Sequence, residues 1–173
     1  MARVAHVDPR NRFLPPRIPV YRIPQTDSWD RIPPLPFLLD PDGDQPAVDR
    51  AVLRIAWSDD GLRLRADVAD AEPVIRPDVP PESGEFWQQD HIEWRMLPDP
   101  RADLDQAQVL LAASGSFAAG GVADASRIRL TVGRSDDGWQ LEATIPFDAY
   151  GLACPAAGDV WRGVLAHVRW AHG

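Results

Sequence analysis

Proline is concentrated in one part of this chain of 173 residues, because 16 of the 18 prolines lie within the first 100 positions. A proline inside a helix removes a backbone hydrogen bond and clashes with the turn before it, so this part cannot be built from long helices. Residues 1–26 are expected to form an extended N-terminal arm, in which residues 18–23 form an edge strand. The proline distribution therefore favours a fold of strands and loops.

Apolar and polar residues alternate through most of the remaining sequence, with the period of two that is typical of strands with one buried face. Together with the edge strand, this pattern predicts eight strands, at residues 18–23, 51–58, 62–69, 90–97, 106–113, 127–132, 139–146 and 161–170. The apolar run at 109–111 also fits a helix, and residues 114–121 are predicted to be a turn region. Because no amphipathic helix separates the strands, the sequence predicts an all-β fold. We expect an antiparallel two-sheet β-sandwich of the jelly-roll or immunoglobulin-like type over residues 27–173.

The alternation also predicts which side chains fill the core. Three tryptophans fall on inner faces, namely Trp57, Trp94 and Trp139. The residues expected to be buried with them are Leu64, Val68, Ile92, Leu141 and Ile145. In the last strand, the apolar side carries Val164, Ala166, Val168 and Trp170. We expect Trp29 and Trp170 to have packing roles.

Charge and cysteine content exclude several classes of function. The net charge is -8 and all 18 basic residues are arginines, so we expect no nucleic-acid partner. The single cysteine, Cys154, rules out an internal disulfide framework. No stretch approaches the roughly 20 apolar residues of a membrane span, and the first residues do not have the pattern of a signal peptide. We therefore expect no membrane partner and a cytoplasmic protein, or an extracellular one if a leader has been removed.

The strand at residues 90–97 carries the clearest functional signal. Its inner face is apolar, and its other face carries His91, Glu93 and Arg95. Trp87 precedes it at the end of a proline-rich loop, residues 70–88, and a loop of this length is usually functional or mobile. An aromatic ring can stack on the apolar C–H face of a sugar while charged groups bond the hydroxyls. The strand and loop therefore predict a surface for a polar, ring-shaped ligand.

Three segments, taken in this order, resemble the family 9 carbohydrate-binding modules. The first is the hairpin at residues 54–70, which turns at Ser58-Asp59-Asp60-Gly61. The second is similar to the family's W-x-x-D-x-[VI]-E strand entrance and reads Trp87-Gln88-Gln89-Asp90-His91-Ile92-Glu93. The third resembles the family's G-W-x-x-E-x-x-I-P signature and reads Gly138-Trp139-Gln140-Leu141-Glu142-Ala143-Thr144-Ile145-Pro146. The resemblance spans about residues 29–169, which is most of the chain.

This resemblance implies a jelly-roll-like sandwich that binds sugars and catalyses no reaction. It also implies a link to carbohydrate catabolism, as an accessory domain of a glycoside hydrolase. In the best-known members, two Trp rings clamp a terminal glucose unit and charged groups bond its hydroxyls. Trp87 matches one clamping ring and Glu93 matches a hydroxyl-bonding acid. Val164 and His167 stand where the family often has Asn and Arg, so the sequence leaves the second ring unassigned.

The candidate ligand-binding residues are Trp87, Glu93, Arg95, His91 and Trp161. The expected ligand is a saccharide with a glucose- or xylose-type ring. Each candidate also has a structural interpretation, because Trp87 fits a lid over the sandwich edge and Glu93 with Arg95 fits a surface ion pair. His91 fits an ordinary surface histidine, and Asp90 before it fits a cap that bonds backbone N–H groups.

Catalysis and cofactor binding are not expected. Asp90 and Glu93 should point to opposite faces of one strand, so they cannot flank a glycosidic bond as the two carboxyls of a glycosidase do. Met96 and His91 also point to opposite faces, which excludes them as the two axial ligands of a haem. The oligomeric state stays open.

The acidic loop at residues 40–44 lacks EF-hand spacing, although Asp40, Asp42 and Asp44 superficially suggest one. We expect no cofactor, and a structural calcium ion, which some family members hold, is the remaining alternative. The main rival to sugar binding is a scaffold or interaction domain that has kept the sandwich and lost the sugar site.

Overall fold

The computed structural model describes residues 19–22, 28–35, 51–97 and 107–170. Most of the predicted N-terminal arm and the acidic loop at residues 40–44 lie outside these ranges, and the boundary at residue 27 stays a prediction. The described part contains nine strands: β1 (Tyr21–Arg22), β2 (Ala51–Ser58), β3 (Gly61–Val68), β4 (His91–Leu97), β5 (Gln108–Ala112), β6 (Phe117–Gly120), β7 (Arg129–Ser135), β8 (Gly138–Pro146) and β9 (Arg162–Val168). Its helical turns are the short 3-10 segments η2 (Trp29–Arg31), η4 (Ala125–Arg127) and η5 (Phe147–Tyr150).

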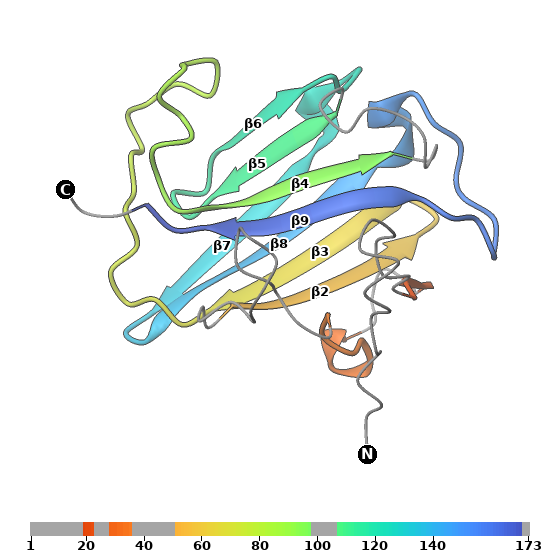
Figure 1. Cartoon of the computed structure of the whole chain (residues 1–173), viewed down its shortest axis with the longest axis horizontal. Helices are drawn as coiled ribbons and strands as arrows, with labels where there is room; N and C mark the ends of the chain where they lie inside the picture. The colour runs from red at the N-terminus through yellow and green to blue at the C-terminus, as the bar shows by residue number, and fades with distance from the viewer. Residues whose placement is uncertain (1–18, 23–27, 36–50, 98–106, 171–173) are drawn as a thin grey trace, which may run out of the picture.

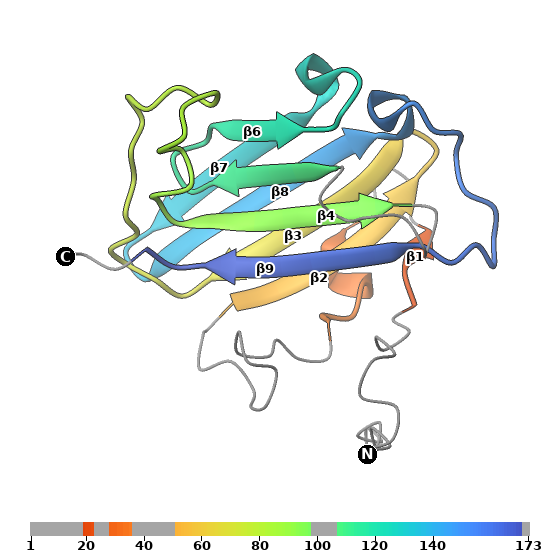
Figure 2. The same cartoon turned by 45° about the horizontal axis from the view of Figure 1, so that its top comes forward.

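The strands form two sheets that lie face to face (Figure 1). One sheet has the order β1-β2-β3-β8-β7 and the other has the order β6-β5-β4-β9. Among the described residues, all strand pairings are antiparallel except that of β1 with β2, which is parallel and lies at the sheet edge (Figure 2). The predicted all-β, two-sheet sandwich is confirmed, and β1 confirms the predicted edge strand.

The core between the sheets is built from the predicted inner faces. Trp94 and Trp139 are buried, with 0% and 3% of their surface exposed. All five aliphatic residues predicted to accompany them are buried as well: Leu64, Val68, Ile92, Leu141 and Ile145. Trp57 is only partly buried, because it lies beside the two-residue edge strand β1, where the Arg22 guanidinium covers its ring at 5.3 Å from the centroid. The predicted face of Trp57 is therefore correct, but the prediction that this residue is buried is wrong.

The face assignment of β9 is wrong, and the register with β4 explains why. Val164 lies opposite Arg95, Ala166 opposite Glu93 and Val168 opposite His91. Directly paired residues point to the same face of a sheet, so this apolar row lies on the outer face. The inner face of β9 instead carries His167, whose ring lies 6.0 Å from that of Trp139.

Two other details differ from the alternation-based prediction. Residues 117–120, predicted as part of a turn, form β6 and pair with β5. The apolar run at 109–111 lies in β5, so the helical alternative is excluded. Val109 and Leu111 are buried in the core, whereas Leu110 is half-buried on the outer face. Because both faces are apolar here, the sequence of this run does not alternate.

A second small core lies on the outer face of the five-stranded sheet. Trp29 and Ile32, from the η2 turn, cover Ala56 of β2, and Arg54 donates to the Ile32 carbonyl at 3.2 Å. The expected packing role of Trp29 is thus confirmed. Within the described ranges, no helix has the length and apolar character needed to cross a bilayer.

Candidate functional site

The polar row of β4 lies on the outer face of the four-stranded sheet. Glu93 stands in the middle of this row, flanked by Leu110 of β5 and Ala166 of β9. Arg95 is flanked by Gln108 and Val164 in the same way. The two central strands therefore present charged and amide groups beside small apolar side chains.

The Glu93 carboxylate is held by two neighbours. Its Oε1 accepts hydrogen bonds from Arg95 Nε at 2.5 Å and from Gln108 Nε2 at 2.6 Å. The Glu93 and Arg95 side chains are 17% and 26% exposed. The ion pair expected between them is present, and both groups still reach solvent. Gln108 was not identified from the sequence, because an amide in a strand of mainly apolar residues carries no signal until its register is known.

The apolar row of β9 runs alongside these polar groups. Val164 is 42% exposed, and Ala166 and Val168 are half-buried. Such a row covers little area, which suits contact with the C–H groups of a small polar ligand. We name the combined surface of Glu93, Arg95, Gln108 and this row the outer-face site.

Trp87 lies in the loop that enters β4 and is 47% exposed. Its indole Nε1 donates to the Gly84 carbonyl at 2.6 Å. The ring also meets Trp170 in an edge-to-face contact, with ring centroids 4.8 Å apart and planes at 81°. Trp170 therefore packs as expected, but its partner is Trp87 outside the core. The sequence could not pair them, because 83 positions separate two residues that both lie outside strands.

The loop between β3 and β4 is fixed by its own side chains. Arg76 donates to Gln88 Oε1 at 2.6 Å and pairs with Glu85 at 2.9 Å. Gln89 is fully buried and bonds the Phe86 carbonyl at 3.1 Å, and Phe86 itself is 2% exposed. These contacts give Trp87 a defined position beside the first residues of β4.

His91 is buried, with 3% of its surface exposed, so the prediction of a surface histidine is wrong. Its Nδ1 lies 2.7 Å from the Gln89 carbonyl oxygen and must donate, since a carbonyl only accepts. Burial lowers the pKa of His91, although the Gln89 carbonyl and the nearby Glu93 and Asp90 act in the opposite direction. A buried neutral imidazole that already bonds the loop serves to hold the Trp87 loop onto β4.

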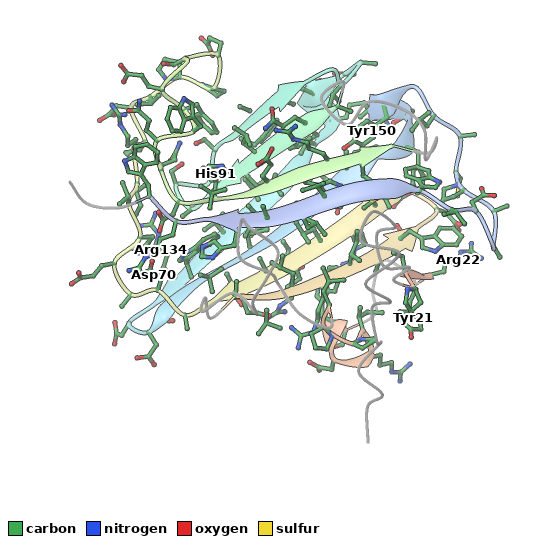
Figure 3. The ribbon with its side chains drawn as sticks, viewed as in Figure 1. Tyr21, Arg22, Asp70, His91, Arg134 and Tyr150 are labelled. Carbon is green, nitrogen blue, oxygen red and sulfur yellow. The ribbon has the colours of Figure 1, made fainter. Side chains whose placement is uncertain are left out.

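Asp90 caps a backbone N–H group as expected, but the group belongs to Trp170, just after the last strand. Its Oδ1 accepts from the Trp170 N–H at 2.6 Å. Figure 3 shows Asp70, His91 and Arg134 toward the same end of the sandwich, away from Tyr150 at the other end. Asp90 therefore belongs to the end of the molecule that carries Trp87.

Trp161 lies at the other end of β9 from Trp170, just before the strand begins. It is half-buried, and its ring meets Phe147 edge-to-face with centroids 5.9 Å apart. The structure therefore brings Trp87, in the loop that leads into β4, together with Trp170, and does not bring Trp161 to them.

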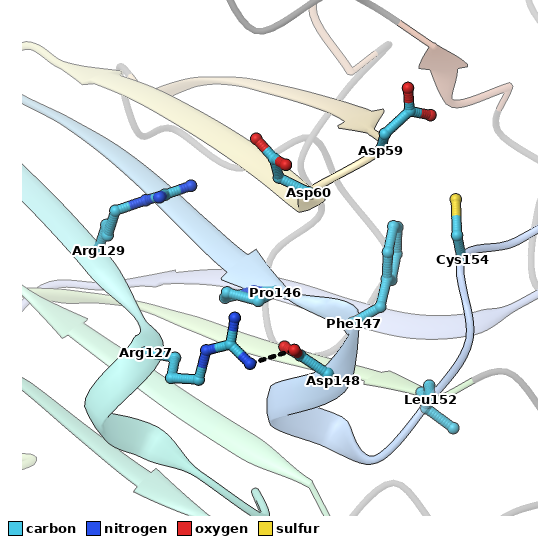
Figure 4. A pocket seen from close by; sticks show the side chains of 9 residues that line it. All are labelled: Asp59, Asp60, Arg127, Arg129, Pro146, Phe147, Asp148, Leu152 and Cys154. Carbon is cyan, nitrogen blue, oxygen red and sulfur yellow. Dashed lines mark hydrogen bonds and ion pairs between the residues drawn. The ribbon is translucent and has the colours of Figure 1, made fainter.

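A cavity of about 360 Å³ lies beside the turn between β2 and β3. It is lined by Asp59, Asp60, Arg127, Arg129, Pro146, Phe147, Asp148, Leu152 and Cys154, and Figure 4 shows the ion pair between Arg127 and Asp148. None of the residues predicted to bind a ligand lines this cavity. It lies at the end of β3 opposite to the loop that holds Trp87.

The described residues contain no group of three His, Cys, Asp or Glu side chains arranged to hold a metal ion. The acidic loop at residues 40–44 lies outside them, so the expected absence of calcium stays a prediction.

No protein-family model matches the sequence, and no curated protein matches it. Among solved structures, the fold is similar to a family 9 carbohydrate-binding module from Caldicellulosiruptor kristjanssonii in complex with cellotriose. That match has a TM-score of 0.59 and 17% identity, over 83% of this chain and 72% of that chain. The glucose complex of a family 9 module from the same organism matches with a TM-score of 0.59 and 18% identity, over 83% and 73% of the two chains.

A candidate carbohydrate-binding protein from Bacteroides uniformis ATCC 8492 matches with a TM-score of 0.50 and 16% identity, over 76% of this chain and 68% of that chain. At these identities the similarity establishes a shared fold. The predicted fold-level resemblance to family 9 modules is confirmed.

Proposed function

We propose that this protein binds saccharides at Trp87 and the adjoining outer-face site, without catalysing a reaction on them. The observation that carries the proposal is the exposed Trp87 ring, held by a hydrogen bond and an aromatic contact at the entrance to the strand that presents Glu93. The shared fold with modules crystallised with cellotriose and glucose supports the same ligand class.

The chemistry of the site fits a glucose- or xylose-type ring. Such a ring has an apolar face of axial C–H groups, which stacks on the exposed face of Trp87. Its equatorial hydroxyls can donate to the Glu93 carboxylate and accept from Arg95 and Gln108. Val164 and its apolar neighbours contact the remaining C–H groups. Binding of a single ring is expected to be modest, since ordering the ligand offsets much of the interaction free energy.

A non-catalytic role agrees with the placement of the carboxyls. Hydrolysis of a glycoside needs two carboxyls about 5–9.5 Å apart on either side of the bond, one of them protonated. Glu93 already accepts from two side chains, and Asp90 is 1% exposed. The two carboxyls therefore cannot stand on opposite sides of one glycosidic bond. We infer a binding module that serves carbohydrate catabolism, as an accessory domain of a glycoside hydrolase.

One observation favours the rival function of a scaffold or interaction domain. The Trp87 and Trp170 rings touch, so no sugar fits between them in this arrangement. A sugar must therefore stack on the solvent face of Trp87 or separate the two rings. If neither happens, the contact between the two rings only stabilises the position of the loop.

Isothermal titration decides between the two functions. Glucose, xylose, cello-oligosaccharides and xylo-oligosaccharides are titrated into wild type, Trp87→Ala and a control, Tyr21→Ala, which removes an aromatic ring of similar exposure (45%) at the edge of the other sheet. We expect binding to wild type and Tyr21→Ala and none to Trp87→Ala. Equal affinity in all three proteins would refute the platform role of Trp87, and no heat with any sugar would favour the scaffold.

A further inference from the structure

The Asp90 carboxyl is buried at the start of β4, with 1% of the residue exposed. Its backbone is held on both sides, since its N–H donates to the Val74 carbonyl and its carbonyl accepts from the Ala113 N–H, each at 2.9 Å. Its Oδ1 accepts the Trp170 N–H at 2.6 Å. Asp90 is thus a fixed point to which the chain leaving β9 is attached.

The second oxygen of this carboxyl is buried, which disfavours its charged form. Asp90 Oδ2 and Asp70 Oδ2 are both buried, and among the described residues neither accepts a hydrogen bond. Asp70, just after β3, is 9% exposed, and its Oδ2 lies 3.0 Å from Arg169 Nε, an ion pair without hydrogen-bond geometry. The negative charge of Asp70 also disfavours the charged form of Asp90.

We propose that Asp90 is a positioning residue for the sugar site, and that its carboxyl holds Trp170 edge-on against Trp87. This inference rests on the proposed function, because it assigns a role within the same site. The hydrogen bond from the Trp170 N–H to Oδ1 fixes the backbone of the residue whose ring meets Trp87 at 4.8 Å. The ion pair between Asp70 and the preceding Arg169 fixes the same segment from the other side.

The surroundings of Asp90 favour its protonated form. Burial raises the pKa of Asp90, and the negative charge of Asp70 raises it further, whereas the Trp170 N–H and His167 act in the opposite direction. The other groups near this carboxyl pair are His91, the next residue in β4, Arg169 on Asp70, and Arg134 of β7, which donates to the Ala113 carbonyl at 2.9 Å.

The raised pKa has a defined consequence for stability. A carboxyl whose pKa is higher in the folded state favours folding when it is protonated, at a pH below its ordinary value of 3.8. This contribution is lost as the pH rises through the higher folded-state pKa. Asp90→Asn removes this dependence, because the amide does not titrate and its oxygen can still accept the Trp170 N–H at every pH.

The test compares Asp90→Asn with Asp90→Ala, two variants of equal charge that differ in hydrogen bonding. The contact between the two indole rings is followed in the absence of sugar by the exciton signal in circular dichroism, and Trp170→Ala defines the signal without the pair. We expect Asp90→Asn to keep the wild-type signal and Asp90→Ala to approach that of Trp170→Ala. In denaturant unfolding, wild type should lose stability relative to Asp90→Asn as the pH rises above 3.8.

Sugar affinity is measured on the same proteins. We expect Asp90→Asn to bind as wild type does, and Asp90→Ala and Trp170→Ala to bind about tenfold or more weakly, a difference of about 1.4 kcal/mol. An unchanged ring signal in Asp90→Ala, or a lost signal in Asp90→Asn, would overturn the positioning role. If Asp90→Ala does not fold, Asp90→Asn decides alone. A lost ring signal in this variant refutes the positioning role, and a flat stability difference from wild type across the pH range contradicts the raised pKa of Asp90.

Failure of the proposed function gives a different result. If no variant binds sugar but the ring signal follows the expected order, Asp90 positions the aromatic pair and the saccharide function is wrong. If wild type binds sugar and Asp90→Ala binds equally well with its ring signal intact, the saccharide function stands and the positioning role is refuted.

Discussion

Replacing Trp139 by alanine should destabilise the protein by about 3–5 kcal/mol, the range for truncating a large aromatic side chain in a core. Trp139 lies in β8, is 3% exposed, and stands between Val68 of β3 and Arg134 of β7. Its indole N–H finds no acceptor among the described residues, so the mutation removes packing and leaves a cavity without breaking a hydrogen bond. The expected loss therefore comes from apolar contacts alone.

The matched control is Trp87→Ala, which deletes the same atoms from a residue that is 47% exposed. This ring contributes its edge-to-face contact with Trp170, and aromatic pairs of that kind are worth about 0.5–1.5 kcal/mol. It also contributes the exposed hydrogen bond to the Gly84 carbonyl, which has no counterpart in Trp139. The difference between the two variants measures the effect of burial, because the chemical change is identical.

Urea unfolding followed by far-UV circular dichroism gives both values, provided that the dependence on denaturant is the same in the three proteins. In thermal unfolding, the loss for Trp139→Ala corresponds to a decrease in Tm of about 6–20 °C for a chain of this size. An unchanged midpoint for Trp139→Ala, or an equal loss in Trp87→Ala, would refute the assignment of Trp139 to the core.

Three further outcomes are expected. Glu93→Gln should weaken sugar binding about tenfold with little change in stability, since a charge-assisted hydrogen bond to a hydroxyl becomes a neutral one. Titration calorimetry measures the affinity, and a Glu93→Gln variant that binds sugar as tightly as wild type would contradict this prediction. Acidification through pH 6.5 should reduce the stability of wild type more than that of His91→Gln. Because burial lowers the pKa of His91, its contribution to stability is fully present above the ordinary value of 6.5 and is lost as the pH falls. Equal pH profiles of the two proteins would argue against a buried neutral imidazole. Asp67→Asn removes a shared partner of Arg54 and Arg65 on the outer face of the larger sheet, although Arg65 keeps its ion pair with Glu142. This change should cost about 1 kcal/mol or less and lose its effect in high salt, and a larger or salt-insensitive loss would contradict the expectation.

The fold class could be predicted because alternation is a local signal and most strands obey it. β3 and β8 have one face in the core and the other in solvent, so their sequences show directly which side is inward. β9 misled the prediction, since its more apolar row faces outward and its inner row includes His167. Only the pairing with β4 shows which face of β9 points inward. This pairing joins two segments that are far apart in the sequence, so the periodicity of β9 alone cannot reveal it.

The candidate site was predictable in part for the same reason. Trp87, Glu93 and Arg95 lie within nine consecutive residues, so a single motif identified them. Gln108 and Trp170 reach the same region through sheet register and through a loop contact, neither of which has a local sequence signature. His91 was misjudged because the alternation gives its face correctly but says nothing of the loop that covers this face.

The outer face of β9 bears on the choice between a sugar site and a protein interface. A permanent interface is usually a broad apolar area with few charges at its centre. Here only Val164 of the apolar row is exposed, and Glu93 and Arg95 lie directly beside it in the next strand. Burying this surface under another protein would desolvate an ion pair, which costs more than the small apolar area returns. A sugar removes little water from the charges and supplies hydroxyls in its place. The composition of this face therefore favours a small polyhydroxylated ligand over a permanent protein partner.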